Sequence, residues 1–263
     1  MAQVSVVIPA FNEAGNIGHL IRETIASVPG EALHEIVVVD DASDDATPVE
    51  VQALLGAFPR LRYVRHARRA GQSAAILSGV RAASASLIAT MDGDGQNDPR
   101  DILRLLAMLE DPRQSNVALV GGIRVARRAT LSKRIASRFA NGLRRRLLDD
   151  RCPDTGCGLK IVRRAVFLAL PYFSGMHRYL PALVQAYGHE AIYIPVNDRP
   201  RRAGVSKYNN VGRGLIGIYD LIGVRWLIKR TTLPAIPATE RRHAAAPEPS
   251  NLSLGEDRTC LQN

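Results

Sequence analysis

The sequence predicts an α/β fold in which a mostly parallel sheet lies between helices. Strand-like and helix-like segments alternate through the first 120 residues, the pattern of strands joined by crossover helices. The chain has 263 residues, of which 46% are hydrophobic, and this suits one α/β domain with a large core or two small ones. We therefore expect a single folded domain over residues 1–230 and a disordered tail over residues 231–263.

The expected strands are short runs of β-branched and apolar residues. In chain order they are Val4–Ile8, Glu35–Asp40, Leu61–Arg65, Leu87–Met91 and Val117–Val120. Helices are expected between them, over Ala14–Ser27, Thr47–Phe58, Gln72–Ala83 and Pro99–Leu109. The last of these carries a start signal, because Asp98 precedes a proline, which is favoured at the first helical position.

The second half of the chain follows a different pattern. Residues 124–146 contain nine arginines and lysines and no acidic residue. Further elements are expected as helices over Arg163–Leu170 and His177–Ala186, a strand over Ala191–Val196, a basic loop over Arg199–Lys207 and a helix over Val211–Arg230.

The last helix is amphipathic and allows two interpretations. Its apolar part, Leu215–Ile228, is interrupted by Asp220 and Arg225, so it is too short and too polar to span a bilayer. It either packs on the core or lies on a membrane surface. The following residues are rich in Ala, Pro, Ser and charge without periodicity, as disordered tails are.

Charge and cysteine content narrow the function classes. The net charge of +10 favours an anionic partner: nucleic acid, an acidic membrane or a phosphorylated substrate. The three cysteines form no C-x-x-C pair, so we expect no structural zinc and reduced thiols in the cytosol. The chain begins directly with a strand-like run, so we expect no signal peptide.

The strongest motif is Asp92-Gly93-Asp94-Gly95-Gln96, directly after an apolar strand. Ligands collect beyond the carboxyl ends of strands in open parallel sheets. Two carboxylates there can hold Mg²⁺ or Mn²⁺, which would neutralise a diphosphate. An EF-hand is excluded, because its glycine and final glutamate positions hold Asn97 and Leu103. A turn without metal remains open.

Two further motifs follow the first two strands. Asp40 and Asp41 end the second strand and can accept hydrogen bonds from ribose or a base, although this segment also suits the N-cap region of the next helix. Pro9, Asn12 and Glu13 follow the first strand, where ordinary turn chemistry is the alternative.

Together the three motifs resemble the inverting family 2 glycosyltransferases, which have the Rossmann-like GT-A fold. The resemblance implies that the motif after the fourth strand, with Gln96, forms the catalytic centre, and that Asp92 and Asp94 bind the metal and the diphosphate. It also implies a nucleotide site on one edge of the sheet. Its expected residues are Pro9, Asn12, Glu13, Asp40, Asp41, Gly71 and Gln72.

Later blocks are similar to the polyprenyl-phosphate sugar transferases of that family. They are Gly121–Arg124, Ser137–Asn141, Asp154–Lys160, and Asn197–Arg199 followed by Ser206-Lys207. Two departures are visible: Gly158-Leu159-Lys160 stands where the group commonly has Phe-Arg, and the transmembrane hairpin of some relatives is missing.

This resemblance implies a reaction and its partners. A sugar would move from a GDP- or UDP-sugar to a polyprenyl phosphate, with inversion, at the cytoplasmic face of a membrane that the protein joins peripherally. A phosphate acceptor also explains the two basic stretches, since Arg and Lys bind phosphate. The residues expected to hold the acceptor phosphate are Arg124, Arg138, Arg202, Ser206 and Lys207.

Other interpretations remain open. A saccharide hydroxyl acceptor would need a carboxylate base, for which Asp154 is suited. His177 and Arg178 either face the acceptor or start a helix. Nucleic-acid binding is disfavoured by an aromatic content of 5%, so no nucleic-acid partner is expected. A dinucleotide oxidoreductase is disfavoured because no G-x-G-x-x-G follows the first strand.

Overall fold

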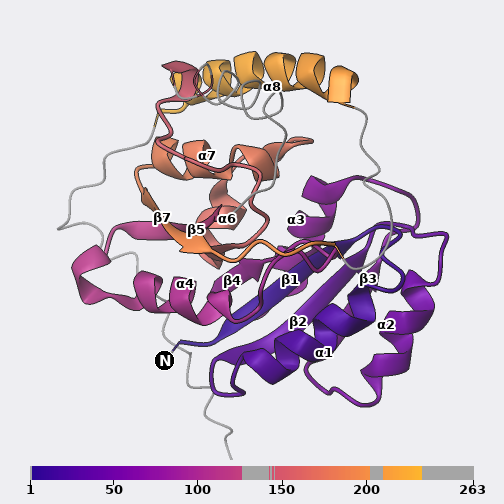
Figure 1. Cartoon of the computed structure of the whole chain (residues 1–263). Coiled ribbons are helices and arrows are strands. Elements are labelled where there is room, and N and C mark those ends of the chain that lie inside the picture. Colours follow the sequence, from indigo (N-terminus) through magenta and orange to yellow (C-terminus); the bar gives the residue numbers. More distant parts are fainter. Residues whose placement is uncertain (1, 126–141, 143, 145, 202–209, 233–263) are drawn as a thin grey trace, which may run out of the picture. The chain divides into compact units, whose positions relative to one another are not determined.

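Figure 1 shows a computed structural model of the chain, in which one twisted sheet lies between helices. The description covers residues 2–125, 142, 144, 146–201 and 210–232, and only the backbone of 210–216. Residues 1–231 form one compact unit. The expected disordered tail lies almost wholly outside the described residues and stays a prediction.

The sheet has seven strands in the order β3-β2-β1-β4-β6-β5-β7. Neighbours pair in parallel except around β6, which runs antiparallel to both β4 and β5. The strands are β1 (Val4–Ala10), β2 (Leu33–Asp40), β3 (Leu61–Arg65), β4 (Leu87–Thr90), β5 (Val117–Arg124), β6 (Lys160–Arg163) and β7 (Glu190–Val196). The predicted mostly parallel sheet is therefore confirmed.

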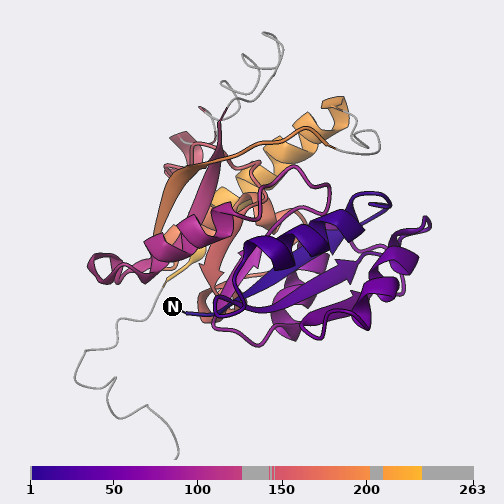
Figure 2. The same cartoon turned by 60° about the horizontal axis from the view of Figure 1, so that its bottom comes forward.

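Helices cover both faces of the sheet (Figures 1 and 2). They are α1 (Ile17–Ser27), α2 (Thr47–Leu55), α3 (Gln72–Ala82), α4 (Asp101–Glu110), α6 (Arg164–Ala169), α7 (Leu180–Ala186) and α8 (Asn210–Arg230), with 3-10 turns η1 (Pro112–Gln114) and η2 (Met176–Arg178). Among the described helices, none has both the length and the apolar character needed to cross a bilayer.

The alternation of side chains in β1 divides the core into two layers. Val6 and Ile8 point to a cluster built with α1, α2 and α4, whereas Val7 points to a cluster built with α3, α6 and α7. All seven residues of β1 are buried, because helices cover the strand on both sides. Such strands read as continuous apolar runs, and this made β1 visible in the sequence.

The sequence missed β6, and the reason is its surroundings. The strand has only four residues, and three of them are buried, so it shows no alternation of apolar and polar side chains. It forms because β4 and β5 supply ladders on both sides, a long-range effect that local periodicity does not encode.

Several predicted boundaries were also wrong. Helix α1 begins at Ile17 rather than Ala14, because Asn12 and Gly15 have positive φ angles of 53° and 80° and form a turn first. Helix α4 begins at Asp101 rather than Pro99. The helix expected over 177–186 is divided between η2 and α7.

Gly79 allows α3 to pack directly on the sheet. A Cβ at this position would lie 2.3 Å from Val7 Cγ1 and 3.1 Å from Val39 Cγ2. We expect Gly79→Val to reduce the free energy of unfolding by about 3 kcal/mol, the upper part of the usual range for overpacking.

Chemical denaturation followed by circular dichroism would measure this change. Gly56→Val is the matched control, because a Cβ there meets nothing within 4 Å. Equal stability of the two variants would contradict the close packing of α3 on β1.

Candidate functional site

The loops after β1, β2 and β4 meet at the carboxyl edge of the parallel strands, where ligands of such sheets bind. Two cavities of about 460 and 160 Å³ lie there. Both are lined by Pro9, Gln72, Asp92, Asp94 and Arg201, so they form one continuous site with the carboxylates in the middle.

The smaller cavity collects most of the residues predicted to bind the nucleotide. Phe11, Glu13, Asp41 and Gly71 line it, and the Arg69 guanidinium lies 4.0 Å from the centre of the Phe11 ring. This side of the site therefore offers a planar aromatic–guanidinium surface beside two carboxylates.

Asp41 organises the loop that closes this cavity. Its Oδ1 accepts from the backbone N–H of Ala70 at 2.8 Å and its Oδ2 from that of Gly71 at 2.7 Å. His66 Nδ1 lies 2.7 Å from Asp41 Oδ1. Gly71 has a φ of 92°, which favours glycine, and it precedes α3, so the carboxylate determines where that helix begins.

The structure separates Asn12 and Asp40 from the two cavities, neither of which they line within the described residues. Asn12 hydrogen-bonds to Asp44 through both its Nδ2 and its Oδ1. Asp40 is buried and accepts from Ser43 N at 2.8 Å and from Tyr63 Oη at 2.7 Å. Both residues join the loop after β2 to its neighbours.

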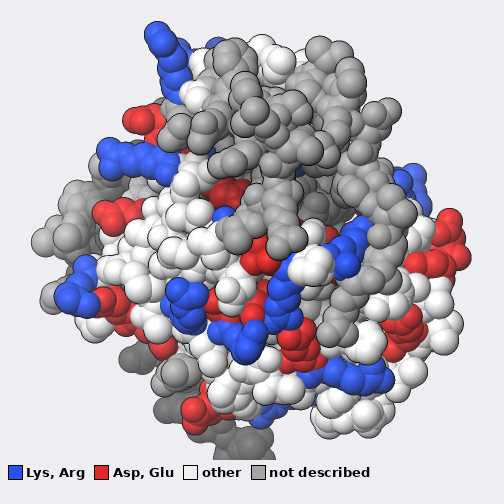
Figure 3. Space-filling model, in the orientation of Figure 1, with Lys and Arg blue, Asp and Glu red and all other residues white. Residues whose placement is uncertain are grey.

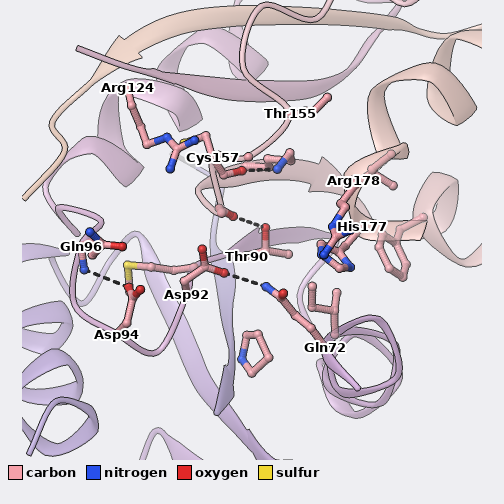
Figure 4. Close-up of a pocket in the computed structure, with 18 of the residues that line it drawn as sticks. Gln72, Thr90, Asp92, Asp94, Gln96, Arg124, Thr155, Cys157, His177 and Arg178 are labelled. Atoms are coloured by element: carbon pink, nitrogen blue, oxygen red, sulfur yellow. Dashed lines mark hydrogen bonds between the residues drawn. The ribbon is translucent and has the colours of Figure 1, made fainter. Parts of the chain in front are cut away.

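Asp92 and Asp94 occupy the centre of the site (Figure 4). Asp92 Oδ1 accepts from Gln72 Nε2 at 2.8 Å, and Asp94 Oδ1 accepts from the backbone N–H of Gln96 at 3.1 Å. Burial raises the pKa of Asp92 to about 6, and the charge of Asp94 adds to this rise. A bound cation would offset both the burial of the Asp92 carboxylate and its repulsion by Asp94.

The carboxylate pair fits a divalent metal that shares its coordination with a substrate. Within the described residues, no three His, Cys, Asp or Glu side chains gather to hold an ion. Mg²⁺ at phosphate-transferring sites commonly uses one or two carboxylates plus substrate phosphates, so two oxygen donors suffice. Gly158 leaves room for the pair, because a Cβ there would lie 2.3 Å from Asp92 Oδ2.

The far side of the larger cavity is basic. Arg124, Lys160, His177 and Arg178 line it, and the only acidic residues in its described lining are Asp92 and Asp94. The Lys160 ammonium donates to the carbonyl of Cys157. His177 Nδ1 lies 2.7 Å from Ser73 Oγ, so η2 is tied to α3. His177 and Arg178 belong to a short helical turn and also line the cavity, and that they face the acceptor stays a prediction.

Arg124 is held by Asp154 through two hydrogen bonds, from Nε at 2.8 Å and from Nη2 at 2.9 Å. Burial opposes the charge of the guanidinium, but the hydrogen bonds and charge of Asp154 keep the pKa of Arg124 above its ordinary value. Asp154 is not part of the described cavity lining. The carboxylate considered as a base is thus engaged in an ion pair.

Two arginines that follow β7, Arg199 and Arg201, form ion pairs with acidic residues around the site. Arg201 Nη2 lies 2.9 Å from Glu13 Oε1 and 3.4 Å from Asp94 Oδ2. Arg199 Nη2 lies 2.5 Å from Asp98 Oδ1, and the backbone N–H of Arg199 donates to the carbonyl of Gln96. Basic and acidic side chains are accordingly interleaved at the centre of the face in Figure 3.

Some residues that line the larger cavity were not predicted from the sequence, although residues next to them were. Arg138, Arg202, Ser206 and Lys207 lie outside the described residues, so their acceptor role stays a prediction. Arg201 and Lys160 were missed. The signal for Arg201 was the basic loop itself, and the signal for Lys160 was the motif Gly158-Leu159-Lys160, in which an arginine was looked for instead.

Comparisons with known proteins identify related chains. The pattern described as glycosyl transferase family 2 matches residues 5–170. A dodecaprenyl-phosphate galacturonate synthase of Rhizobium johnstonii is 35% identical over 236 residues, which are 88% of this chain and 69% of the relative. An undecaprenyl-phosphate 4-deoxy-4-formamido-L-arabinose transferase of Edwardsiella ictaluri is 34% identical over 83% of this chain and 66% of its own length. The chain thus spans about two thirds of these relatives.

Solved structures share the fold. A mannosyltransferase from Pyrobaculum calidifontis in complex with GDP-Man and Mn²⁺ superposes with a TM-score of 0.64, at 25% identity over 89% of this chain and 66% of that one. A glucosyl-3-phosphoglycerate synthase from Mycobacterium tuberculosis, in complex with Mn²⁺, UDP-glucose and glycerol 3-phosphate, gives 0.65 at 19% identity over 89% and 82%. The predicted GT-A fold is confirmed by these likenesses.

The Arg124–Asp154 ion pair is expected to contribute to the stability of the fold. The side chains are only 15% and 16% exposed, so Asp154→Ala would leave a largely desolvated guanidinium without its partner. We expect a loss of about 3 kcal/mol in the free energy of unfolding, as for other broken buried pairs.

Urea denaturation of both proteins would measure the loss. Arg113→Ala provides the control, since that guanidinium is 88% exposed in its pair with Asp111 and should matter little. If Asp154→Ala were as stable as the parent, the ion pair would not hold this side of the cavity.

Proposed function

The chain belongs to glycosyl transferase family 2, and we propose that it transfers a sugar from a nucleoside diphosphate sugar to a polyprenyl phosphate. The relatives at 35% and 34% identity are named for polyprenyl-phosphate acceptors. The first of these matches covers 88% of the chain.

The observation that carries the proposal is the basic acceptor side of the larger cavity. A saccharide hydroxyl must lose its proton to attack, and this requires a base within reach. Of the acids considered, Asp154 is engaged by Arg124, and the carboxylates in the described lining are the pair that faces the diphosphate. A phosphate monoester is mostly a dianion at neutral pH and needs no such base.

The nucleoside would occupy the smaller cavity. Phe11 with Arg69 offers a stacking surface for a base, and Glu13 and Asp41 are acceptors for hydroxyl or amino donors. The sugar would then lie above Asp92 and Asp94, where the two cavities meet. A UDP- or GDP-sugar is the donor class, and the solved neighbours were crystallised with UDP-glucose and GDP-Man.

Asp92 and Asp94 would hold Mg²⁺ or Mn²⁺, and the ion would supply positive charge to offset that of the diphosphate leaving group. Gln72 orients Asp92 through its hydrogen bond, and Arg201 adds a positive charge beside Asp94. Arg124, Lys160 and Arg178 would bind the acceptor phosphate on the opposite side.

The reaction then follows from this placement. An acceptor phosphate oxygen attacks the anomeric carbon as the bond from that carbon to the diphosphate oxygen breaks. The configuration inverts because attack and departure occur on opposite faces of the sugar. Since the acceptor is a lipid, we expect the chain to act as a peripheral protein at the cytoplasmic face of a membrane.

The function is tested by incubating the protein with a short polyprenyl phosphate, Mn²⁺ or Mg²⁺ and a panel of UDP- and GDP-sugars. Mass spectrometry should detect a glycosylated lipid whose formation stops when EDTA removes the metal. Asp92→Asn should reduce its rate at least about 100-fold, as loss of transition-state electrostatic stabilisation does.

Asp111→Asn is the control, because that carboxylate lies outside the described linings of both main cavities. Full activity of Asp92→Asn would contradict the metal role. Transfer to an added saccharide in place of the lipid would favour a hydroxyl acceptor.

Arg178 offers a test of the acceptor side. We expect Arg178→Gln to lower kcat/KM for the prenyl phosphate by about tenfold to 100-fold, since a hydrogen bond to a charged group is worth about 1.5–3 kcal/mol. Nucleotide affinity, measured by titration calorimetry, should not change. Arg163→Gln, outside the described lining of this cavity, is the matched control. An unchanged kcat/KM for the prenyl phosphate in Arg178→Gln would show that the acceptor phosphate does not bind at Arg178.

A further inference from the structure

Helix α8 exposes large apolar side chains along one side. Ile218, Ile222 and Trp226 are 51%, 61% and 60% exposed at intervals of four residues, and the adjacent Tyr219 is 80% exposed. A helix that only packs on a core turns such residues inward. We name these four residues the outer face of α8.

The opposite side of α8 is held firmly on the domain. Leu221 and Val224 are buried against Tyr179 and Ala182 of the η2–α7 region, together with Leu148. The Tyr179 hydroxyl donates to the carbonyl of Gly217 at 3.2 Å. The rotation of the helix is therefore determined by its packing, and the outer face is what this packing leaves exposed.

The charged residues of α8 are arranged to suit an anionic surface. Lys229 and Arg230 are exposed in the last turn, and the Arg230 guanidinium lies 5.6 Å from the centre of the Trp226 ring. Asp220, the acidic residue within 217–230, turns the other way, with its Oδ2 3.2 Å from the site of a Cβ on Gly175. Apolar and aromatic residues beside cations, without acids, characterise helices that lie in a bilayer interface.

The position of α8 links this face to the site. The helix lies next to α7 in Figure 1 and packs on Ala182 of that helix, and α7 follows directly on η2. His177 and Arg178 of η2 line the basic side of the larger cavity. Burial raises the pKa of Asp220, and the charge of Arg178 acts against this rise, so the inner side of α8 and the acceptor side interact electrostatically.

We propose that the outer face of α8 binds the surface of an anionic lipid bilayer. The apolar side chains would enter the boundary between headgroups and acyl chains, while Lys229 and Arg230 contact lipid phosphates. The choice of a bilayer rests on the proposed function, in which the acceptor is a membrane lipid. Docking on α8 would bring the acceptor side of the cavity close to the headgroups.

The chain carries its own reporter, because Trp226 is its single tryptophan. Full-length protein is mixed with vesicles of phosphatidylcholine containing 30% phosphatidylglycerol, and with vesicles of phosphatidylcholine alone. We expect the Trp226 emission to shift to the blue on the anionic vesicles, to be quenched by brominated acyl chains, and to respond less at high salt.

The variant Ile218→Ser/Ile222→Ser keeps the reporter and removes half of the outer face. It should bind the anionic vesicles at least tenfold more weakly, with an unchanged melting temperature because both side chains are exposed. Val49→Ser is the matched control, since Val49 of α2 is 67% exposed away from α8 and should leave binding unchanged.

Two results would overturn the proposal. One is equal vesicle binding by the parent and by Ile218→Ser/Ile222→Ser. The other is a blue shift without vesicles that grows with protein concentration, together with a dimer in sedimentation that the double variant abolishes, because a second copy would then cover the face.

A water-soluble acceptor distinguishes membrane docking by α8 from the proposed glycosyl transfer. With a short prenyl phosphate dissolved in water, the double variant should turn over like the parent, whereas with polyprenyl phosphate in vesicles it should be at least tenfold slower. Vesicle binding without any glycosylated lipid would disprove the function and leave the docking surface standing. Turnover of both acceptors without vesicle binding would disprove the docking surface alone.

Discussion

The burial of the Asp92 carboxylate beside Asp94 is the constraint on which the rest of the site depends. Two like charges at the end of a buried strand are unfavourable unless dipoles and cations surround them. The amide of Gln72 supplies one hydrogen bond, and Lys160 and Arg124 lower the pKa of Asp92 against the effect of burial. A divalent ion shared with a diphosphate would complete this compensation, so the site is arranged to be most favourable when its donor is bound.

This constraint explains why one strand of the sheet runs backwards. The antiparallel strand β6 starts at the carboxyl end of β4, where its first residue, Lys160, pairs with Thr90. The segment before it passes so close to Asp92 that a Cβ at position 158 would displace the Asp92 carboxylate. Thr90 Oγ1 donates to the carbonyl of Gly158 at 2.8 Å and keeps the two segments together. A parallel strand in this place would have entered from the opposite edge of the sheet.

Ion pairs join the loops around the carboxylates. Arg201 connects the loop after β1 with the loop after β4, through Glu13 and Asp94. Arg124 is fixed by Asp154, whose sequence neighbours Thr155 and Gly156 line the larger cavity. Because these pairs are partly desolvated, removal of one partner would cost more than it does in a surface pair. In the proposed function the same cations would lie within reach of an anionic substrate.

Local sequence determined much of this protein. Apolar runs of four to eight residues identified six of the seven strands, and the acidic motifs after β1, β2 and β4 identified the edge of the sheet that carries the site. These signals are readable because strand burial and turn chemistry act over a few residues. The family and its fold followed from the order of the motifs.

Tertiary structure decided what depends on partners far apart in the chain. Lys160 rather than an arginine faces Asp92, Arg201 is paired with Glu13 and Asp94, and Asp154 binds Arg124 instead of standing ready as a base. The same holds for α8, whose sequence allowed a core helix or a membrane-surface helix. Its packing on Tyr179 and Ala182 selects the buried side, and the exposure of Trp226 follows from that contact. Such outcomes depend on contacts between residues far apart in the sequence, and a pattern of a few neighbouring residues does not determine those contacts.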